Sequence, residues 1–377
     1  MILAIAPLES TRQDHPSLTH STLGQDQAER IRNDQWHLRF LNVAQAHTIS
    51  QGEGVVVAVP DTGVDPHPDI RKNLLKGTDT VAGEFGDGRQ DSNSHGTSMA
   101  GLIAAHGSGV SSGALGVAPK SKILPIKAAG DDNFGEADDL AAAVEYATAN
   151  SAQVISISSG GASTPHLVRA IKSALAANVT IVASAGNTPQ NSTAYPASEE
   201  GVIAVGGVDR AGRHAAISVT GPKIDVVAPA VDIYSTSYDG KYSKGTGTSS
   251  ATAIVAGAAA LIRSKYPYLP AREVAHRLTA TAVDKGPPGR DDEYGYGVID
   301  LVAALTADVP PLGFESVSAP AGAGPTTTAA AQPDGQDDGS TVRGLATLGV
   351  IVAAGLGWMV IARRRRRGDD PPPRISR

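Results

Sequence analysis

The chain has 377 residues, of which 41% are hydrophobic and 4% aromatic, and its formal net charge is −6. This length allows one large α/β domain with appendages, and the small acidic charge argues against a protein that binds nucleic acid. No cysteine is present, which excludes disulfides, thiolate zinc sites and a cysteine nucleophile. Because glycine and alanine are abundant, we expect a core of small side chains on closely packed elements.

Residues 1–34 form a polar N-terminal extension. The apolar run at residues 2–7 is shorter than a signal-peptide core of about 7–15 residues. Residues 10–34 are rich in Gln, Asp, Arg and His, so we expect them to be exposed or poorly ordered. Residues 35–47 carry Trp36 and Phe40 and are expected to dock on the following domain as a short helix or arm.

Short β-branched runs alternate with helical patterns through residues 35–306. Strands are expected at residues 54–61, 122–127, 153–158, 179–184, 201–205 and 224–227. Helices are expected at residues 94–106, 136–150, 165–177 and 271–280, and in the run that follows Ser249. This alternation predicts an α/β domain with a doubly wound, mostly parallel sheet and helices on both faces. Functional sites in such sheets lie at the carboxyl ends of the strands.

The composition changes after residue 306. Residues 307–343 are rich in Pro, Ala, Gly and Thr, which is typical of a linker that does not fold. Residues 344–362 contain no charged residue and are long enough to cross a membrane as one transmembrane helix. The basic tail at residues 363–377 should lie in the cytoplasm and leave the preceding domain outside the cell membrane. Export of that domain requires a targeting signal, so we expect further residues upstream of the printed start.

Four residues together indicate acyl-transfer chemistry. Ser249 stands at the expected start of a helix, where unpaired N–H groups and the helix dipole favour developing negative charge. Asp61 ends a strand, where a carboxylate could orient a histidine, and His95 opens a helix. Asn187 ends a strand through Ala-Gly and could donate a hydrogen bond to an oxyanion.

Two alternatives concern the same motifs. Asp61-Thr-Gly63 is also a signature of aspartic proteases, but these need two such loops, and the chain has no second Asp-Thr-Gly or Asp-Ser-Gly. The alternation of strands and helices also contradicts an all-β aspartic protease. His67, in a polar Pro-rich turn, and His106, at a helix end, are rival candidates for the base.

The order Asp, His, Asn, Ser along the chain matches a known template, that of subtilisins. The local motifs are Val-Pro-Asp-Thr-Gly (59–63), His-Gly-Thr-Ser-Met-Ala-Gly (95–101), Ala-Ser-Ala-Gly-Asn (183–187) and Gly-Thr-Ser-Ser-Ala (247–251). Residues 52–305 therefore resemble a subtilisin-like serine protease. The resemblance implies that Asp61, His95 and Ser249 form a catalytic triad and that Asn187 helps to bind the oxyanion. It also implies a set of substrate-binding residues, namely Ser158, Gly160, Gly161, Asn133 and Gly135.

The segments outside this domain resemble those of mycosins, the membrane-anchored subtilases of type VII secretion systems in actinobacteria. The shared features are an arm before the first strand, a Pro-rich stalk, one C-terminal span and an arginine tail. The chain departs from the usual subtilase pattern at Ser98, Ser250 and Ala253, none of which takes part in the chemistry. Unlike most mycosins, it has no cysteine.

The predicted function is hydrolysis of peptide bonds by a membrane-anchored serine endopeptidase, through an acyl-enzyme. Its partners would be a protein or peptide substrate, the membrane through residues 344–362, and a type VII secretion complex. The alternatives are a scaffold in a membrane secretion complex, with or without catalysis, and a general degradative protease. No nucleotide or metal motif is present, so no cofactor is expected. Structural calcium stays open, because the pairs Asp131-Asp132 and Asp138-Asp139 have no recognisable ligand spacing.

Overall fold

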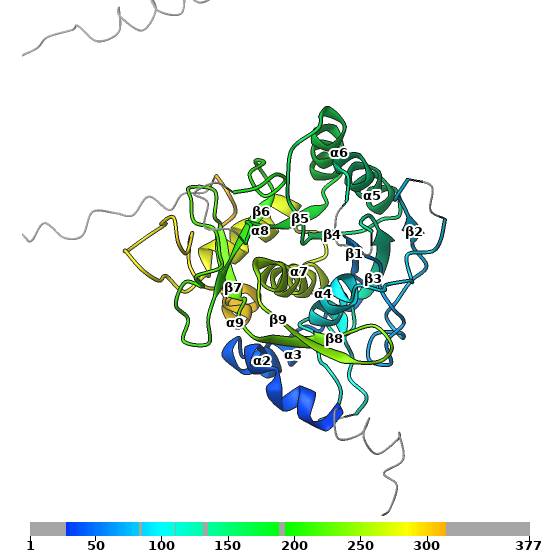
Figure 1. Cartoon of the computed structure of the whole chain (residues 1–377). Coiled ribbons are helices and arrows are strands. Elements are labelled where there is room, and N and C mark those ends of the chain that lie inside the picture. The colour runs from blue at the N-terminus through cyan, green and yellow to red at the C-terminus, as the bar shows by residue number, and fades with distance from the viewer. Residues whose placement is uncertain (1–27, 83–84, 110, 131–134, 188–192, 314–377) are drawn as a thin grey trace, which may run out of the picture. The chain divides into compact units, whose positions relative to one another are not determined.

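The computed structural model describes residues 28–82, 85–109, 111–130, 135–187 and 193–313. Its centre is a sheet in the order β2-β3-β1-β4-β5-β6-β7, in which every neighbouring pair of strands is parallel (Figure 1). The strands are β1 (Val56–Asp61), β2 (Thr78–Asp79), β3 (Lys122–Lys127), β4 (Val154–Ile157), β5 (Thr180–Ser184), β6 (Ile203–Val208) and β7 (Val226–Pro229). The predicted α/β domain with a mostly parallel sheet is confirmed.

Helices cover both faces of this sheet. On one face lie α4 (His95–Ala104) and α7 (Thr248–Lys265), and on the other lie α5 (Ala137–Ala149) and α6 (Pro165–Ala176) (Figure 1). Side chains of a strand point alternately to the two faces. Val57 and Val59 accordingly belong to the core around α4 and α7, while Ala58 belongs to the core around α5 and α6. The short helices α8 (Ala271–Ala280) and α9 (Leu301–Thr306) add to the α7 side.

The path of the chain through the sheet places a crevice at one edge. After β1 the chain forms β2 and β3 on one side of β1, and then crosses to form β4 on the other side. Such a reversal of strand order leaves a crevice at the carboxyl ends of the strands. Asp61 is the last residue of β1 and Ser158 follows β4, so both lie at this edge.

Helix α7 is buried along most of its length, from Thr248 to Arg263. Its packing requires small side chains, because a Cβ at Gly257 would lie 2.7 Å from the Cβ of Val117. Glycine in a helix interior costs about 0.5–1 kcal/mol relative to alanine, so the close approach is the reason for its presence. The expected core of small side chains is present here.

The N-terminal arm packs on the domain and begins before residue 35. Residues 28–34 form a helix. Its residues Glu29, Arg30, Asn33 and Asp34 are exposed, as expected, but Ile31 is only 3% exposed, which the polar composition did not indicate. The helices α2 (Trp36–Phe40) and α3 (Val43–His47) follow. The indole Nε1 of Trp36 donates to the carbonyl oxygens of Val231 (3.2 Å) and Asp232 (3.1 Å). Burial of Ile31 and Trp36 explains why a segment of polar composition folds.

An antiparallel hairpin of β8 (Ile233–Thr236) and β9 (Tyr242–Gly245) is not among the predicted elements. Asp239-Gly240 between two alternating segments is a recognised hairpin signal that could have indicated it. The hydroxyl groups of Ser235 and Thr236 donate to carbonyl oxygens of α4, at 2.8 and 2.7 Å. The hairpin is therefore held against the helix that begins with His95.

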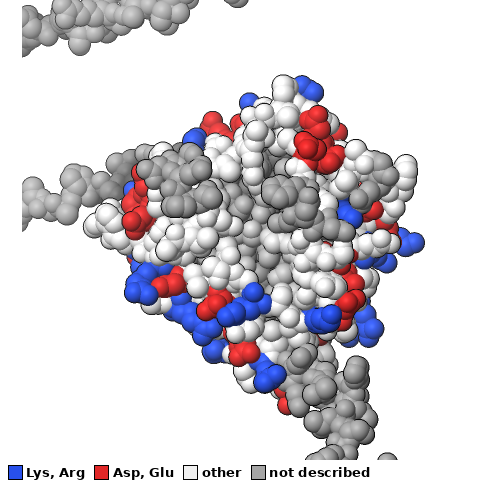
Figure 2. Space-filling view, viewed as in Figure 1, with Lys and Arg blue, Asp and Glu red and all other residues white. Residues whose placement is uncertain are grey.

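Charges of both signs are interspersed on the face shown in Figure 2, with Lys and Arg gathered mainly along its lower edge. Exposed ion pairs occur in the described part of the chain: Arg213 lies 2.8 Å from Asp209, and Lys244 lies 3.0 Å from Asp232. Exposed pairs of this kind contribute about 0–1 kcal/mol each, so they do not determine the fold.

The C-terminal predictions fall outside the described residues. These are the end of the linker, the membrane span at residues 344–362 and the tail at residues 363–377. Within the part of the chain that the structure describes, no helix is long and apolar enough to cross a membrane.

Candidate active site

Asp61 and His95 meet at the carboxyl edge of the sheet. Asp61 ends β1, and His95 is the first residue of α4. The Nδ1 atom of His95 lies 2.7 Å from Oδ1 of Asp61, and that oxygen also accepts the N–H of Thr62 at 2.8 Å. The Asp61 side chain is 3% exposed and that of His95 is 23% exposed. With Nδ1 bound to the carboxylate, Nε2 is the nitrogen left free to exchange a proton.

The surroundings of His95 raise its pKa above the ordinary 6.5. Burial alone would lower the pKa, because a buried imidazolium is poorly solvated. The charge and hydrogen bond of Asp61, together with the charge of Asp91, outweigh that effect. His95 therefore becomes neutral, and able to accept a proton, at a higher pH than an ordinary histidine.

Ser249 lies in the first turn of α7 and lines the same cavity as His95, a space of about 560 Å³. Its hydroxyl donates to the carbonyl oxygen of Ser158 at 3.0 Å, and the Ser158 hydroxyl donates in return to the carbonyl oxygen of Ser249 at 3.3 Å. Among the described residues, no hydrogen bond joins Ser249 to His95. The two side chains thus share a cavity, with the serine hydroxyl turned toward the end of β4.

Asn187 lines this cavity and is held by the first residue of α7. Its Oδ1 atom accepts the Thr248 N–H at 2.7 Å and the Thr248 hydroxyl at 2.9 Å. Because a backbone N–H can only donate, the oxygen of the Asn187 amide, and not its NH₂ group, must face the helix. The Nδ2 group is left to donate elsewhere. Gly247 gives it room, since a Cβ there would lie 3.1 Å from Nδ2.

The other predicted site residues line two adjoining cavities. Gly135 and Gly160 line both the 560 Å³ cavity and a more apolar one of about 320 Å³, while Ser158 lines the first and Gly161 the second. The Gly161 N–H already donates to the carbonyl oxygen of Tyr195 at 3.0 Å, so it is not free for a substrate. Asn133 lies outside the described residues.

Several lining residues have no motif in the sequence. The smaller cavity is also lined by Leu140, Leu167 and Tyr195, and the larger one by Ser243 and Gly245 of the hairpin. Leu140 and Leu167 belong to the apolar faces of predicted helices. The sequence could therefore predict that they pack against the sheet, but not that they line a cavity. The hairpin residues would have followed from the Asp-Gly turn signal.

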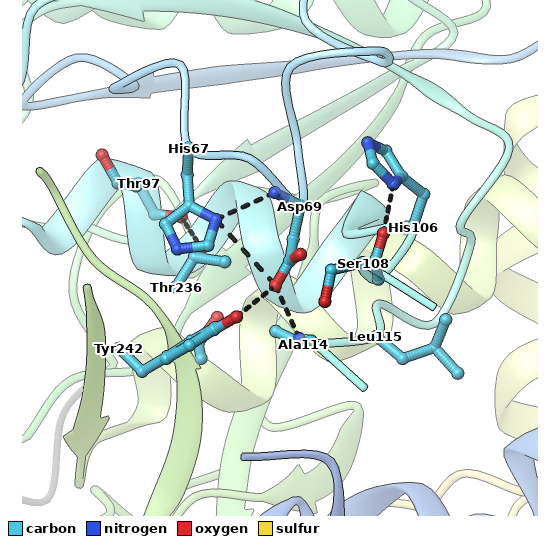
Figure 3. Close-up of polar contacts among 12 residues, drawn as sticks. His67, Asp69, Thr97, His106, Ser108, Ala114, Leu115, Thr236 and Tyr242 are labelled. Atoms are coloured by element: carbon cyan, nitrogen blue, oxygen red, sulfur yellow. Dashed lines mark hydrogen bonds and ion pairs between the residues drawn. The ribbon is translucent and has the colours of Figure 1, made fainter. Parts of the chain in front are cut away.

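The rival bases His67, which is fully buried, and His106, which is partly exposed, lie in a separate cluster (Figure 3). The Nδ1 atom of His67 accepts the Asp69 N–H at 3.0 Å, and that of His106 lies 2.7 Å from the carbonyl oxygen of Gly107. Asp69 accepts the Tyr242 hydroxyl at 2.8 Å. Neither histidine lines the cavity that holds His95 and Ser249, so the geometry favours His95 as the base.

Within the described residues, no group of three or more His, Asp or Glu side chains is arranged to hold a metal ion. Of the two acidic pairs considered for calcium, Asp131-Asp132 lies outside the described residues. Asp138 and Asp139 lie in the first turn of α5, where carboxylates complement the helix dipole.

Comparison with known proteins shows the family of this chain. Residues 52–297 match the model of the subtilase family, peptidase S8. The chain belongs to the subtilase family. It is 39% identical over 260 residues to subtilisin DY from Bacillus licheniformis, which covers 67% of this chain and 92% of that protein. Subtilases need no cofactor for catalysis, and membership makes the chain a serine endopeptidase.

Two solved structures connect this subtilase to mycosins. MycP1 from Mycobacterium smegmatis has a TM-score of 0.67 and 29% identity, covering 75% of this chain and 88% of that one. MycP3 from the type VII (ESX-3) secretion system has a TM-score of 0.62 and 33% identity, covering 72% and 88%. The predicted resemblance to a mycosin-like subtilase is confirmed.

Proposed function

We propose that Asp61, His95 and Ser249 are the catalytic triad of this endopeptidase and that Asn187 helps to bind the oxyanion. The observation that carries the proposal is the 2.7 Å contact between Asp61 and His95 beside the cavity that Ser249 and Asn187 also line. Asp61 keeps the Nδ1 proton of His95 in place, so that Nε2 can act as the base.

The reaction begins when the Ser249 hydroxyl leaves the Ser158 carbonyl and turns to His95. Catalytic hydrogen bonds are often absent in a free enzyme and form only with substrate bound, so the resting contact is compatible with this step. His95 takes the serine proton as Oγ attacks the peptide carbonyl. It then gives the proton to the leaving amine, and water hydrolyses the acyl-enzyme by the same route.

The oxyanion of the tetrahedral intermediate needs two donors. Asn187 can supply one through Nδ2, because its oxygen is engaged by Thr248. The N–H of Ser249 can supply the other, since N–H groups in the first turn of a helix have no intrahelical acceptor. Loss of one such donor costs about 10²–10³ in turnover.

The substrate is a protein or peptide whose extended backbone lies along the segment at residues 158–160 and near Gly135. The cavity of about 320 Å³ is lined by Leu140, Leu167 and Tyr195, which suits an apolar side chain of the substrate. We therefore expect cleavage to depend on an apolar residue near the scissile bond.

A fluorophosphonate probe tests the triad on the full chain without knowledge of the substrate. We expect the wild type to be labelled covalently and Ser249→Ala not to be labelled. Ser250→Ala is the matched control, because Ser250 is the next residue in the same cavity and should keep full labelling. Folded wild-type protein that reacts no faster than Ser249→Ala would contradict the triad and favour the scaffold role.

We also propose that the chain is a mycosin-type protease anchored by residues 344–362, with its domain outside the cell membrane and its tail inside. The structural similarity to MycP1 from the ESX-1 and MycP3 from the ESX-3 type VII secretion systems supports this role. The absence of cysteine allows a clean test. A membrane-impermeant maleimide added to intact cells should label Ser340→Cys but not Ser376→Cys, and the reverse pattern would contradict the orientation.

A further inference from the structure

Asp91 is a buried carboxylate close to the proposed triad, and its charge acts on His95. It stands four residues before His95 in the sequence and is 7% exposed. Its Oδ1 atom accepts the hydroxyl of Thr62 (3.0 Å) and the N–H groups of Asn93 (3.0 Å) and Ser94 (2.9 Å). Its Oδ2 atom accepts the N–H (3.0 Å) and hydroxyl (2.5 Å) of Thr97. All five of these partners donate to Asp91, which suits an ionised carboxylate, because its two oxygens can only accept hydrogen bonds.

These hydrogen bonds join the two segments that carry Asp61 and His95. Thr62 follows Asp61 directly, and its hydroxyl donates to Asp91 while accepting the N–H of Gly96 at 3.1 Å. Thr97 lies in the first turn of α4, where N–H groups lack an intrahelical partner. One carboxylate thus holds both the end of β1 and the start of α4. The 2.7 Å contact between Asp61 and His95 spans the same two segments.

The charge of Asp91 also counters an unfavourable field on His95. As the first residue of α4, His95 sits at the positive end of the helix dipole, which opposes formation of the imidazolium. The charges of Asp61 and Asp91 both favour the imidazolium. A negative charge fixed at this helix end favours the imidazolium that forms as the serine is acylated.

We propose that Asp91 is a positioning residue for the reaction: it locks the end of β1 to the start of α4 and keeps a negative charge behind His95. The inference rests on the proposed triad. The competing explanation is that Asp91 merely caps a loop and contributes to stability.

The test measures the second-order rate of fluorophosphonate labelling of the full chain from pH 5 to 10, with thermal unfolding of each variant alongside. For Asp91→Asn we expect labelling to slow by roughly 10- to 100-fold, as for small misplacements of catalytic groups. We also expect the midpoint of the acidic limb of this pH profile to move to lower pH, because the charge of Asp91 helps to raise the pKa of His95.

Asp69→Asn is the matched control for loss of a buried carboxylate. Asp69 is fully buried and accepts the Ala114 N–H and the Tyr242 hydroxyl, in the separate cluster of Figure 3. Asp69→Asn should lower the unfolding temperature without moving the midpoint of the pH profile of labelling. The proposal would be overturned if Asp91→Asn is labelled at a rate within twofold of the wild type. It would also be overturned if Asp91→Asn slows labelling only as much as Asp69→Asn does and leaves the midpoint of the pH profile unchanged.

Thr62→Val provides a second test of the proposal in case Asp91→Asn does not fold. It removes the hydroxyl that links the two segments but leaves the charge of Asp91 and its other four donors. We expect labelling to slow about tenfold with an unchanged midpoint, whereas labelling at the wild-type rate would refute the link. A wild type that shows no Ser249-dependent labelling would refute the proposed triad itself, and this inference with it.

Discussion

Replacement of Asp61 by asparagine should slow acylation of Ser249 and shift its pH dependence in a defined direction. The carboxylate lies 2.7 Å from the Nδ1 atom of His95 and is one cause of the raised pKa of that histidine. The Thr62 N–H donates to the same oxygen. We therefore expect the amide oxygen introduced by Asp61→Asn to keep this position and preserve the tautomer of His95, so that the main loss is the negative charge.

The size of the effect follows from the contact. An opposite charge this close raises a pKa by about 1–3 units, and each unit corresponds to about 1.4 kcal/mol of preference for the imidazolium. Loss of that preference in the transition state slows acylation by roughly 10- to 10³-fold. If the amide instead turns so that its NH₂ group donates to Nδ1 of His95, the proton of the neutral imidazole moves to Nε2, which can then no longer act as the base. The rate of acylation would then fall by about 10⁴-fold.

The assay is the rate of fluorophosphonate labelling of the full chain as a function of pH. His95 must be neutral to accept the serine proton, so the wild-type rate should rise with pH through a midpoint above 6.5. In Asp61→Asn the plateau should fall and the midpoint should move to lower pH, because the charge that helps to raise the pKa of His95 is lost. A wild-type midpoint below 6.5, or the same midpoint in both proteins, would refute the reasoning.

Three further predictions concern stability. Burial lowers the pKa of His37 to about 3, so the unfolded chain binds a proton below 6.5 that the native one does not. Stability should therefore fall by roughly 2–3 kcal/mol between pH 6.5 and 4.5. Denaturant titrations should show a smaller loss in His37→Leu, and equal losses would contradict this assignment. Gly257→Ala should lower the free energy of unfolding by about 1–3 kcal/mol, because its Cβ would clash with Val117. Gly161→Ala is the control and should cost little, because the space around Gly161 is open. Equal melting temperatures of the two variants would contradict this prediction. Arg263 is 5% exposed and donates to the buried hydroxyl of Thr180 at 3.1 Å. Arg263→Met should leave that hydroxyl without its donor and lose about 1–3 kcal/mol, which unchanged thermal unfolding would disprove.

The fold class follows from local features of the sequence, and the proposed triad follows from motifs that resemble those of subtilases. Buried parallel strands need continuous apolar runs, and the helices that cover them need an apolar face, so both leave a pattern that does not depend on distant residues. The predicted strands and helices accordingly agree with the structure to within about three residues at each end. Because the carboxyl ends of parallel strands meet at one edge, motifs that follow β1 and β5 were bound to lie near each other.

Weak or non-local signals explain the elements that the sequence did not predict. Strand β2 has two residues and α9 has six, which is too short for any periodicity to be distinctive. The helix at residues 28–34 has a polar composition and depends on burial of Ile31. The hairpin of β8 and β9 is held by hydroxyl groups on carbonyl oxygens of α4, more than a hundred residues earlier in the chain.

The sequence by itself determined which residues gather at the carboxyl edge of the sheet, because strand order and motif position are properties of the chain. Only the tertiary structure decided how their atoms are directed. It turned the Ser249 hydroxyl to Ser158, fixed the amide of Asn187 through Thr248 and bound the Gly161 N–H to Tyr195. It also joined Asp91 to the hydroxyl of Thr62, 29 residues earlier in the chain. These contacts join residues that are far apart in the chain, so no local pattern encodes them, and their geometry exists only once the elements have packed.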